Sequence, residues 1–373
     1  MVRRFMYIQM LRLADYRNYA NLELEFSQGT NILYGDNAQG KTNILEALLV
    51  AATTKSHRGV YDRDLIRFGQ DEGHIRCVLI KKGLDWQIDL HLRKSRSKGI
   101  AINGQRIRKA SELIGLLHVV LFSPEDLSIV KSGPALRRRF LDMELCQLDP
   151  SYLHDLNQYN KIVEQRNRLL RQIPDNPSLE ETISIWNEQL LNFGCNVIRR
   201  RQEFIRDLNE VIGKIHLRLS GEKEHLQLIY EPNVTEDRFA DELERIRIRE
   251  KYIGSTAIGP HKDDFSFCCD EIDIRRYGSQ GQQRTCALSL KLSELELVKR
   301  MTGEEPVLMM DDVLSELDTS RQNYLLESLG GIQTFITCTG LDEFVRHRFT
   351  IDRLYRVEAG NVTQMNRSAE PML

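Results

Sequence analysis

The first part of the chain alternates between apolar and polar side chains in the manner of β-strands. Residues 75–92 alternate loosely, which is typical of two strands joined as a hairpin, and Asn103-Gly104 is a turn signal within a second hairpin. Residues 31–34 form a short apolar run that favours a strand, whereas residues 44–51 have the apolar spacing of a helix. The pattern therefore predicts strands with a helix among them.

A helical pattern replaces the strand pattern from Ser151 onward. Apolar side chains recur at steps of three and four residues on two segments, which are separated by a turn containing Pro174 and Pro177. The first segment carries Tyr152, Leu156, Tyr159, Val163 and Leu170, and the second carries Trp186, Leu190, Phe193, Val197, Phe204, Leu208, Val211 and Ile215. This spacing predicts an antiparallel helical hairpin with a coiled-coil-like seam, which would form an arm of roughly 30–50 Å. An ordinary helical subdomain would give the same pattern.

Strand patterns return in the last third of the chain. Residues 306–312 are an apolar run that begins at a proline and ends in two carboxylates, and residues 334–339 are a second apolar run. Such runs suit parallel strands buried on both faces. A long amphipathic helix is expected from about Cys286 to about Met301. We therefore predict an α/β fold of mixed sheets with helices, divided into residues 1–130, a helical arm domain at 131–250, and residues 251–373.

A glycine-containing loop joins the strand-like run at 31–34 to the helix-like run at 44–51. Two glycines let the backbone N–H groups face an anion, and the following helix adds the positive end of its dipole. The loop reads GDNAQGKT, a full match to GxxxxGK(S/T), and consists of Gly35, Asp36, Asn37, Ala38, Gln39, Gly40, Lys41 and Thr42. Lys41 would reach the β- and γ-phosphates of ATP, and the Thr42 hydroxyl would ligate Mg²⁺.

The two carboxylates that end the run at 306–312 provide the second half of a phosphate site. An acid at the carboxyl end of a buried strand can hold Mg²⁺, so Asp311 is the metal-side candidate beside Thr42. Asp312 is one residue further on, points elsewhere and is predicted to polarise the attacking water. Asp312 and Lys41 are thus the catalytic candidates. A strand followed by an Asp-rich turn is the plainer alternative.

The segments around Asp311 distinguish among phosphate-loop proteins. They are Ser279, Gly281 and Gln282 before the long helix, Ser315 and Asp318 after the two carboxylates, and Thr339-Gly340 at the end of the last strand-like run. In this order the motifs resemble an ABC-type P-loop ATPase head with Walker A, signature, Walker B, D-loop and switch strand. The resemblance implies that the signature binds the γ-phosphate held by a second subunit, so that ATP joins two heads in a homodimer.

A closer resemblance rests on six segments that occur together in one order. They are LRLADYRNY at 11–19, GDNAQGKT at 35–42, FSPEDL at 122–127, IGPHKDD at 258–264, SQGQQRT at 279–285 and DDVLSELD at 311–318. From about Met6 to about Thr363 the chain resembles the RecF family of bacterial recombination mediators, which are related to SMC and Rad50 heads. Lys262 stands where many members have arginine. Thr339-Gly340 stands where many ABC heads have a histidine, which fits slow hydrolysis.

The RecF resemblance carries specific implications for activity and partners. It implies a weak, DNA-stimulated ATPase that binds single- and double-stranded DNA, at gaps or at junctions between the two. It also implies that the protein works with RecO and RecR to help load RecA. SMC and Rad50 arms are far longer than the predicted hairpin, and the CxxC at the tip of a Rad50 arm has no counterpart in this sequence.

Basic residues are clustered although the formal net charge is only −2. Residues 91–109 contain seven Lys or Arg and no acid, and 137–139 and 199–201 are arginine triplets. Local basic clusters on a neutral chain are typical of a defined phosphate-contact face. We therefore predict DNA contacts by Arg93, Lys94, Arg96 and Lys98, and by Arg137, Arg138 and Arg139. Solubilising surface charge is the alternative.

Composition narrows the class of protein further. A hydrophobic content of 41% and a charged content of 28% are typical of a soluble globular chain, no apolar stretch is long enough for a membrane span, and no secretion signal follows Met1. We therefore expect a cytoplasmic, nucleoid-associated protein. The seven cysteines are scattered without CxxC spacing, so zinc is not expected. For His261 the sequence leaves three roles open: a contact to DNA, ordering of the nucleotide face, or a place in a structural turn. Arg17 is a candidate phosphate contact.

Two classes of function remain open. In the first, ATP binding joins two heads, the dimer grips DNA, and hydrolysis acts as a timer that releases it. In the second, turnover itself remodels DNA or drives a transporter, as in a helicase or an exporter head, although helicase motifs are not evident. A P-loop kinase would lack the signature and the D-loop.

Overall fold

The computed structural model describes residues 6–327, 330–341 and 350–365. By its internal contacts the chain divides into unit 1, which comprises Met1–Pro124 and Val298–Leu373, and unit 2, which comprises Glu125–Leu297. Residues 251–297 thus group with unit 2, because their strand β10 (Asp264–Cys269) pairs with β9 (Leu226–Glu231). The three-part division at residues 130 and 250 stays a prediction. Residues 1–5, where the sequence predicts no secretion signal, lie outside the described part.

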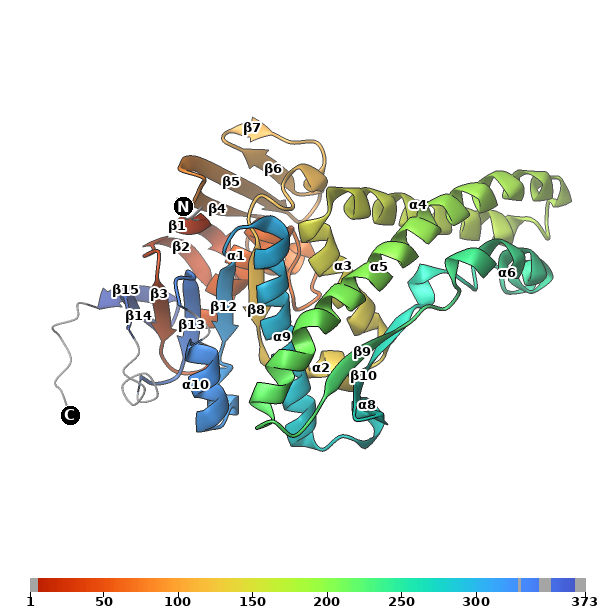
Figure 1. Ribbon diagram of the computed structural model, residues 1–373. Helices are drawn as coiled ribbons and strands as arrows, with labels where there is room; N and C mark the ends of the chain where they lie inside the picture. Colours follow the sequence, from red (N-terminus) through yellow and green to blue (C-terminus); the bar gives the residue numbers. More distant parts are fainter. Residues whose placement is uncertain (1–5, 328–329, 342–349, 366–373) are drawn as a thin grey trace. The chain divides into compact units, whose positions relative to one another are not determined.

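One of the two sheets of unit 1 is antiparallel, with strand order β2-β1-β4-β5-β6-β7 (Figure 1). Its strands are β1 (Met6–Tyr16), β2 (Tyr19–Glu25), β4 (Glu72–Lys81), β5 (Leu84–Arg93), β6 (Gly99–Ile102) and β7 (Gln105–Arg106). The hairpin predicted at residues 75–92 is confirmed as β4 and β5. The turn at Asn103-Gly104 joins β6 to β7, as predicted.

The second sheet of unit 1 is mostly parallel and has the order β15-β14-β3-β13-β12-β8. Its strands are β3 (Thr30–Tyr34), β8 (Val119–Phe122), β12 (Val307–Asp311), β13 (Thr334–Cys338), β14 (Arg353–Glu358) and β15 (Asn361–Met365). The prediction that the apolar run at 306–312 contains a buried parallel strand is confirmed, because β12 pairs in parallel with β13 and with β8. Parallel pairing brings the carboxyl ends of β3 and β12 to one edge of the sheet, which is where α/β proteins place ligands.

Helix α1 (Lys41–Thr53) lies between the two sheets and is buried on nearly all sides. It contacts β4 and β5 of the antiparallel sheet and β8, β12 and β13 of the parallel sheet. Its apolar side chains join those of both sheets in one core, which explains why the helix is apolar all round. The other described helix of eight or more residues that lies wholly within unit 1 is α10 (Thr319–Glu327).

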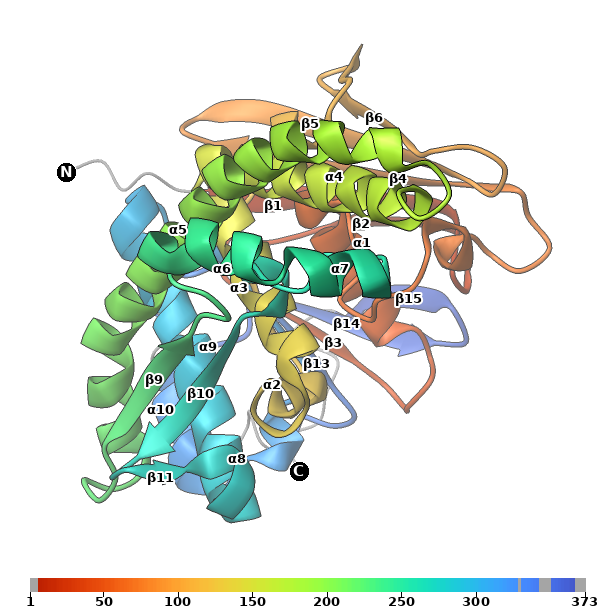
Figure 2. The same ribbon diagram turned by 90° about the vertical axis from the view of Figure 1, so that its right-hand side faces the viewer.

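Unit 2 combines helices with a small antiparallel sheet of order β11-β10-β9, as Figure 2 shows. Its helices are α2 (Leu127–Lys131), α3 (Pro134–Leu148), α4 (Pro150–Gln172), α5 (Ile183–Leu219), α6 (Phe239–Arg245), α7 (Arg247–Ile253), α8 (Ile274–Tyr277) and most of α9 (Gln280–Thr302), and its third strand is β11 (Ile272–Asp273). The main core lies where α3, α5 and α9 pack on β9 and β10.

The two long helices predicted after Ser151 are confirmed as α4 and α5, which run side by side (Figure 1). Arg200 on α5 donates to Asp149 at the start of α4, with Nε 2.7 Å from Oδ2, whereas Arg166 near the end of α4 donates to Asn187 near the start of α5 at 2.8 Å. The start of α4 thus contacts a later part of α5, and the end of α4 contacts the start of α5. The two helices are therefore antiparallel. Among the described residues, no helix combines the length and apolar character that crossing a membrane requires.

Helix α9 differs from the amphipathic helix that the sequence predicted. All residues from 285 to 295 are buried, including Lys291, which is 3% exposed, and Glu294, which is 1% exposed. The two form an ion pair with each other, and Lys291 lies 5.7 Å from the centre of the Phe140 ring. Paired charges can lie in a core because each satisfies the other. The polar positions of the sequence pattern are therefore inside the protein, and the helix has no wide solvent-facing side.

Arg201 is the centre of a buried polar network in unit 2. Its side chain is 2% exposed and donates to Asp142 at 2.7 Å, to Asp263 at 3.1 Å and to the carbonyl of Pro260 at 2.6 Å. Asp263 is fully buried and also accepts from the hydroxyl of Tyr230 at 2.5 Å. A buried carboxylate needs such donors, because an unpaired charge in the protein interior is costly.

We predict that Arg201→Met lowers the free energy of unfolding of unit 2 by about 3–5 kcal/mol, because it leaves Asp263 buried without its cation. Arg199→Met is the matched control from the same triplet. Arg199 is 55% exposed and pairs with Glu236 at the surface, so its loss should cost less than about 1 kcal/mol.

The measurement uses the two tryptophans, which lie in different units: Trp86 in unit 1 and Trp186 in unit 2. In a Trp86→Phe background, urea unfolding followed by fluorescence reports on unit 2. Equal unfolding midpoints for Arg201→Met and Arg199→Met would show that the buried network has no stabilising role.

Candidate nucleotide site

The loop between β3 and α1 has a backbone that only glycine can adopt at two positions. Gly35 has φ 148° and Gly40 has φ 116°. A Cβ atom at Gly35 would lie 2.3 Å from the carbonyl oxygen of Val357, and one at Gly40 would lie 2.5 Å from Nδ2 of Asn18. Atoms of this same polypeptide already occupy the position that a Cβ would take at each glycine. The two glycines of the motif are therefore required by local sterics, and together they set the curvature of the loop.

Neighbouring turns hold the carbonyl side of this loop. Nδ2 of Asn18 donates to the carbonyl of Gln39 at 3.1 Å, and the Tyr19 hydroxyl donates to that of Gly40 at 3.0 Å. The backbone N–H of Gly360 also donates to the Gln39 carbonyl, at 3.2 Å. These contacts fix the Gln39–Gly40 end of the loop directly before α1. Because the first N–H groups of a helix have no carbonyl partner within it, the start of α1 is where an anion such as a phosphate chain would bind.

Lys41 is folded beneath the loop. Its Nζ donates to the carbonyls of Gly35 at 2.5 Å and Asp36 at 2.8 Å, and the residue is 6% exposed. Burial lowers the pKa of Lys41, and the negative charges of Asp312 and Asp311 oppose that shift. The ammonium group thus lies between the loop and the acidic end of β12, where it can neutralise charge on a bound phosphate.

Thr42 and Asp311, which are 269 positions apart in sequence, are in direct contact. The Thr42 hydroxyl donates to Oδ1 of Asp311 at 2.8 Å, and the Thr337 hydroxyl donates to the same oxygen at 2.7 Å. Burial raises the pKa of Asp311, whereas these two hydrogen bonds lower it. A hydroxyl and a carboxylate beside a phosphate cradle are the oxygen donors that Mg²⁺ prefers, so the residues present fit this ion.

Asp312 leaves the line of the strand. Its φ is 55°, in the left-handed region, and its N–H donates to the Thr337 hydroxyl at 3.0 Å. The backbone turn explains why two adjacent carboxylates need not share one role: Asp311 ends the strand, whereas Asp312 begins the next segment. Its negative charge still acts on Lys41.

Arg17 is not available to a phosphate in this structure. Its Nε and Nη2 each lie 2.7 Å from a carboxylate oxygen of Glu46, and its Nη1 donates to the carbonyl of Asp64 at 2.9 Å. Glu46 is fully buried on α1, and its pKa is lowered: burial raises it, but the hydrogen bonds from Arg17 and Ser56 outweigh that effect. Arg17 therefore serves as the counter-ion of a buried acid, and the suggested phosphate contact is corrected.

Some residues near the site were not identified from the sequence. Thr337 bridges Asp311 and Asp312. Burial raises the pKa of Asp311, and the charges of His57 and of the exposed Arg58 oppose that rise. Thr337 sits on β13, which is the strand next to β12, so only the sheet order identifies it. Arg58 follows α1, and its Nη1 lies 3.3 Å from Oδ1 of Asn43. A single arginine outside any motif gives no signal.

The signature segment caps α9 within unit 2. The N–H of Ser279 donates to Oε1 of Gln282 at 2.9 Å, and the N–H of Gln282 donates to the Ser279 hydroxyl at 3.2 Å. This reciprocal pair is a capping box, which explains the serine and glutamine at this spacing. Ser279 and Gly281 are both exposed, and a Cβ at Gly281 would have no atom nearer than 3.9 Å. The N-terminus of α9 is thus an open surface.

The two D-loop candidates have local structural roles. The Ser315 hydroxyl donates to the carbonyl of Asp312 at 2.8 Å and so shapes the turn after β12. Asp318 accepts from the N–H of Arg321 at 3.0 Å, which lowers the pKa of Asp318 and caps the start of α10. Both residues lie at exposed positions.

The arginine triplet at 137–139 is largely internal to unit 2. Arg137 is 1% exposed, and its Nε and Nη2 bind both oxygens of Asp264 at 2.6 and 2.9 Å. Its Nη1 donates to the carbonyls of Ile129 and Ser132. A guanidinium so enclosed cannot reach a DNA phosphate, so the DNA contact predicted for Arg137 is corrected. Arg138 donates to the carbonyl of Asp263 at 2.7 Å and, like Arg139, is half-buried.

The basic residues between 93 and 98 differ from one another in exposure and in their partners. Lys98 is held by Asp62 at 2.9 Å and by the carbonyl of Thr54, with its side chain 16% exposed. Arg93 is half-buried and lies 2.9 Å from Nδ1 of His91. Lys94 and Arg96 are exposed, and Lys94 pairs with Asp71 at 3.6 Å. Of the four predicted DNA contacts, Lys94 and Arg96 present their charges to solvent.

His261 belongs to a structural turn. Its Nε2 donates to the carbonyl of Thr256 at 3.2 Å, so its Nδ1 is the acceptor for the hydroxyl of Tyr159 at 2.6 Å. Burial lowers the pKa of His261 to about 4, which keeps the ring neutral in this arrangement. Both ring nitrogens are thus bonded to neighbouring groups of the protein. Among the three roles that the sequence left open for His261, this supports the structural one.

Comparison with known proteins places these features in a family. Residues 7–363 match the family model described as "RecF/RecN/SMC N terminal domain". The chain is 56% identical over 357 residues to "DNA replication and repair protein RecF" of Agathobacter rectalis, covering 96% of this chain and 99% of the relative. It is 44% identical to the protein of the same name from Clostridium acetobutylicum, with coverage of 96% and 100%.

Solved structures give the same answer at the level of the fold. The structure described as "recombination mediator protein RecF-ATP in RecFOR pathway" matches with a TM-score of 0.92 and 34% identity, over 98% of this chain and 99% of that one. An Smc head domain from Pyrococcus furiosus matches with a TM-score of 0.56 at 16% identity, which shows a shared fold. The chain therefore belongs to the RecF family of DNA replication and repair proteins, with the α/β ATPase head fold of SMC proteins.

Proposed function

We propose that the protein is an ATP-dependent DNA-binding clamp of recombinational repair, in which ATP binding joins two heads and slow hydrolysis releases the DNA. The observation that carries this proposal is the contact between Thr42 and Asp311 at 2.8 Å, directly after a loop whose Gln39 carbonyl accepts from Asn18. That arrangement unites a phosphate cradle with oxygen donors for Mg²⁺. Relatives solved with ATP support ATP as the nucleotide.

Each residue of the site has a proposed role in the reaction. The loop N–H groups and Lys41 would hold the phosphates, and Thr42 and Asp311 would hold Mg²⁺, which when bound neutralises charge on the phosphates. Asp312 would orient and polarise the attacking water. Thr339-Gly340, at the exposed end of β13, offers no imidazole beside the γ-phosphate. A threonine and a glycine in place of a histidine support slow hydrolysis, so that ATP turnover would act as a timer.

The proposed dimer depends on the exposed cap of α9. Ser279 and Gly281 would contact the γ-phosphate held by a second copy of the chain, because an open helix N-terminus attracts an anion. Ser315 and Asp318, at exposed positions after β12, would lie in the same interface. Two nucleotides would then be enclosed between two heads arranged head to tail.

The proposed substrate is DNA at gaps or at junctions between single and double strands. Relatives carry the name DNA replication and repair protein, and a solved relative is described as a recombination mediator of the RecFOR pathway. We therefore propose RecO and RecR as partners in helping to load RecA, and a cytoplasmic, nucleoid-associated location. Lys94 and Arg96, which face solvent, are the proposed phosphate contacts best supported by exposure, with Arg93, Arg138 and Arg139 as further candidates.

The first prediction for this function concerns Lys41. Lys41→Met removes the cation of the cradle, so ATP affinity should fall by at least about tenfold, the equivalent of about 1.4 kcal/mol. Lys109→Met, at an exposed lysine of the same unit, is the control and should bind ATP normally. Binding of a fluorescent ATP analogue measures both. Unchanged affinity in Lys41→Met would exclude the loop as the nucleotide site.

The second prediction concerns the interface between heads. Ser279→Arg should leave ATP binding by the single chain intact but abolish ATP-dependent dimers, because the longer side chain clashes with the partner's nucleotide. Asp312→Asn should instead trap the dimer by slowing water attack. Ser178→Arg, at another exposed serine of unit 2, is the control. Sedimentation with and without ATP gives the result, and full dimerisation of Ser279→Arg would rule out a signature that acts in trans.

The third prediction concerns DNA. If Lys94 and Arg96 bind phosphates, the double change to Gln should weaken binding to all sequences alike. It should also flatten the plot of log affinity against log salt by about 0.9 for each phosphate that is no longer neutralised. Arg356→Gln is the control, because Arg356 is 55% exposed in the same unit and pairs with Glu358. Binding to gapped DNA at several salt concentrations is the measurement. An unchanged slope would assign these two residues to solubility alone.

A further inference from the structure

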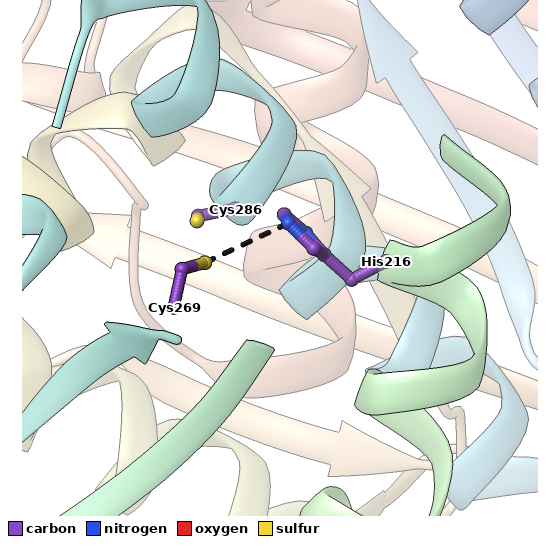
Figure 3. Close-up of side chains that lie close together, drawn as sticks. All are labelled: His216, Cys269 and Cys286. Carbon is purple, nitrogen blue, oxygen red and sulfur yellow. Dashed lines mark hydrogen bonds between the residues drawn. The ribbon is translucent and has the colours of Figure 1, made fainter. Parts of the chain in front are cut away.

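Three side chains with metal-binding atoms converge inside unit 2, and none of them is a residue discussed above for nucleotide or DNA. They are His216 on α5, Cys269 at the end of β10 and Cys286 on α9, and Figure 3 shows them close together. His216 and Cys286 have no exposed surface, and Cys269 is 3% exposed. Their donor atoms all lie within 4.8 Å of one another.

The distance between two of these atoms, those of Cys269 and His216, matches that of a metal site. Sγ of Cys269 lies 3.7 Å from Nε2 of His216. For a tetrahedral zinc ion, with Zn–S of about 2.3 Å and Zn–N of about 2.0–2.1 Å, a sulfur and a nitrogen ligand are ~3.6 Å apart. Two thiols and an imidazole are also the ligand types that zinc prefers in structural sites.

His216 has a hydrogen-bond partner at Nδ1, the ring nitrogen that lies away from Cys269. The Ser289 hydroxyl donates to the carbonyl of Thr285 at 2.8 Å, so it accepts from Nδ1–H of His216, 2.9 Å away. A ring that donates through Nδ1 can offer Nε2, which lies on the side of Cys269, to a metal ion. Such a hydrogen bond on the far nitrogen is the usual outer support of a zinc-bound histidine.

Glu224 supplies a second reason for a cation at this point. Its Oε2 lies 3.2 Å from Nε2 of His216, so a carboxylate and a lone pair face each other. Two acceptors at this distance repel unless a proton or a metal ion lies between them. Glu224 is 25% exposed at its side chain, so it can complete the coordination or leave the fourth position to water.

We propose that His216, Cys269 and Cys286 bind one structural Zn²⁺, with Glu224 or water as the fourth ligand. Each thiol would lose its proton to solvent when the ion binds, and the ion would join α5, β10 and α9. The expectation from sequence that zinc is absent relied on CxxC spacing, which this site does not use.

The site would also fix the signature segment. Cys286 directly follows Thr285, the last residue of SQGQQRT, and Glu224 accepts from the amide of Gln282 through its other oxygen, Oε1, at 3.0 Å. The ion would thereby hold the first turns of α9 and the cap that they carry. This consequence for dimerisation rests on the proposed function, whereas binding of the ion does not.

The test measures metal in the full-length protein purified under reducing conditions without chelator. Wild-type protein should contain about one zinc ion per chain by mass spectrometry of metals, and Co²⁺ substituted for it should give the intense visible absorption of a tetrahedral site with a thiolate-to-metal band. Cys269→Ser and Cys286→Ser should lose both signals. Cys268→Ser, one residue earlier on the same strand and outside the cluster, should keep both.

A variant that touches no ligand separates metal binding from folding. Ser289→Ala removes the support of Nδ1 and should weaken Co²⁺ affinity by about 10–100-fold. If Cys286→Ser does not fold, Ser289→Ala and a Co²⁺ titration of the wild type still show whether the site binds metal. ATP-dependent sedimentation is recorded separately, so a failed dimer with bound zinc counts against the proposed function alone.

Three results would overturn the zinc site. The first is wild-type protein with reduced thiols that neither contains zinc nor binds Co²⁺. The second is a Co²⁺ spectrum that survives unchanged in Cys269→Ser. The third is a disulfide between Cys269 and Cys286, seen as a mass lower by two hydrogens, in freshly purified protein.

Discussion

The burial of helix α1 between two sheets is the constraint on which the nucleotide site depends. From Ile44 to Thr53 every residue of the helix is buried, so the helix can neither slide nor tilt without disturbing both sheets. Its first N–H groups have no partner within the helix and must be satisfied elsewhere. The loop from β3 delivers them to the edge of the parallel sheet, beside the carboxyl end of β12. Packing all around the helix thus fixes the position of the phosphate-binding groups at its N-terminus.

The same constraint explains the buried ion pair on α1. Glu46 lies on a helix with no exposed face, so its charge needs a partner from the surrounding sheet. Arg17, at φ 52° in the turn between β1 and β2, supplies a fork that matches both carboxylate oxygens. Asn18 and Tyr19 follow in the same turn and hold the loop carbonyls. One turn therefore neutralises the helix and supports the phosphate cradle.

Unit 2 contains several buried arginines, whose burial could not be predicted from the sequence. Arg137, Arg166 and Arg201 are each at most 2% exposed and each binds an acid, namely Asp264, Glu250 and Asp263. Two of these acids belong to the GPHKDD segment. That segment is therefore the counterpart of basic residues on α3 and α5, and it orders the core of unit 2. Solvent-exposed charge on this unit is correspondingly smaller than the basic triplets indicate.

The sequence by itself determined the elements whose pattern is local. The phosphate loop with its flanking strand and helix, the central parallel strand ending at Asp311, the β4–β5 hairpin and the pair of long helices all follow from short-range periodicity and turn residues. The family also followed from sequence, because its motifs keep their order along the chain. These features depend on residues close together in the chain, which is why they could be predicted.

Only the tertiary structure decided which side chains meet and which are buried. It brought Thr337 to Asp311, enclosed Arg137 around Asp264, turned the polar positions of α9 inward and gathered His216, Cys269 and Cys286 from three separate elements. Basic runs look the same in sequence whether they face solvent or a buried acid, and cysteines far apart carry no spacing signal. Burial and long-range pairing arise from packing between elements, and a linear pattern contains no information on that packing.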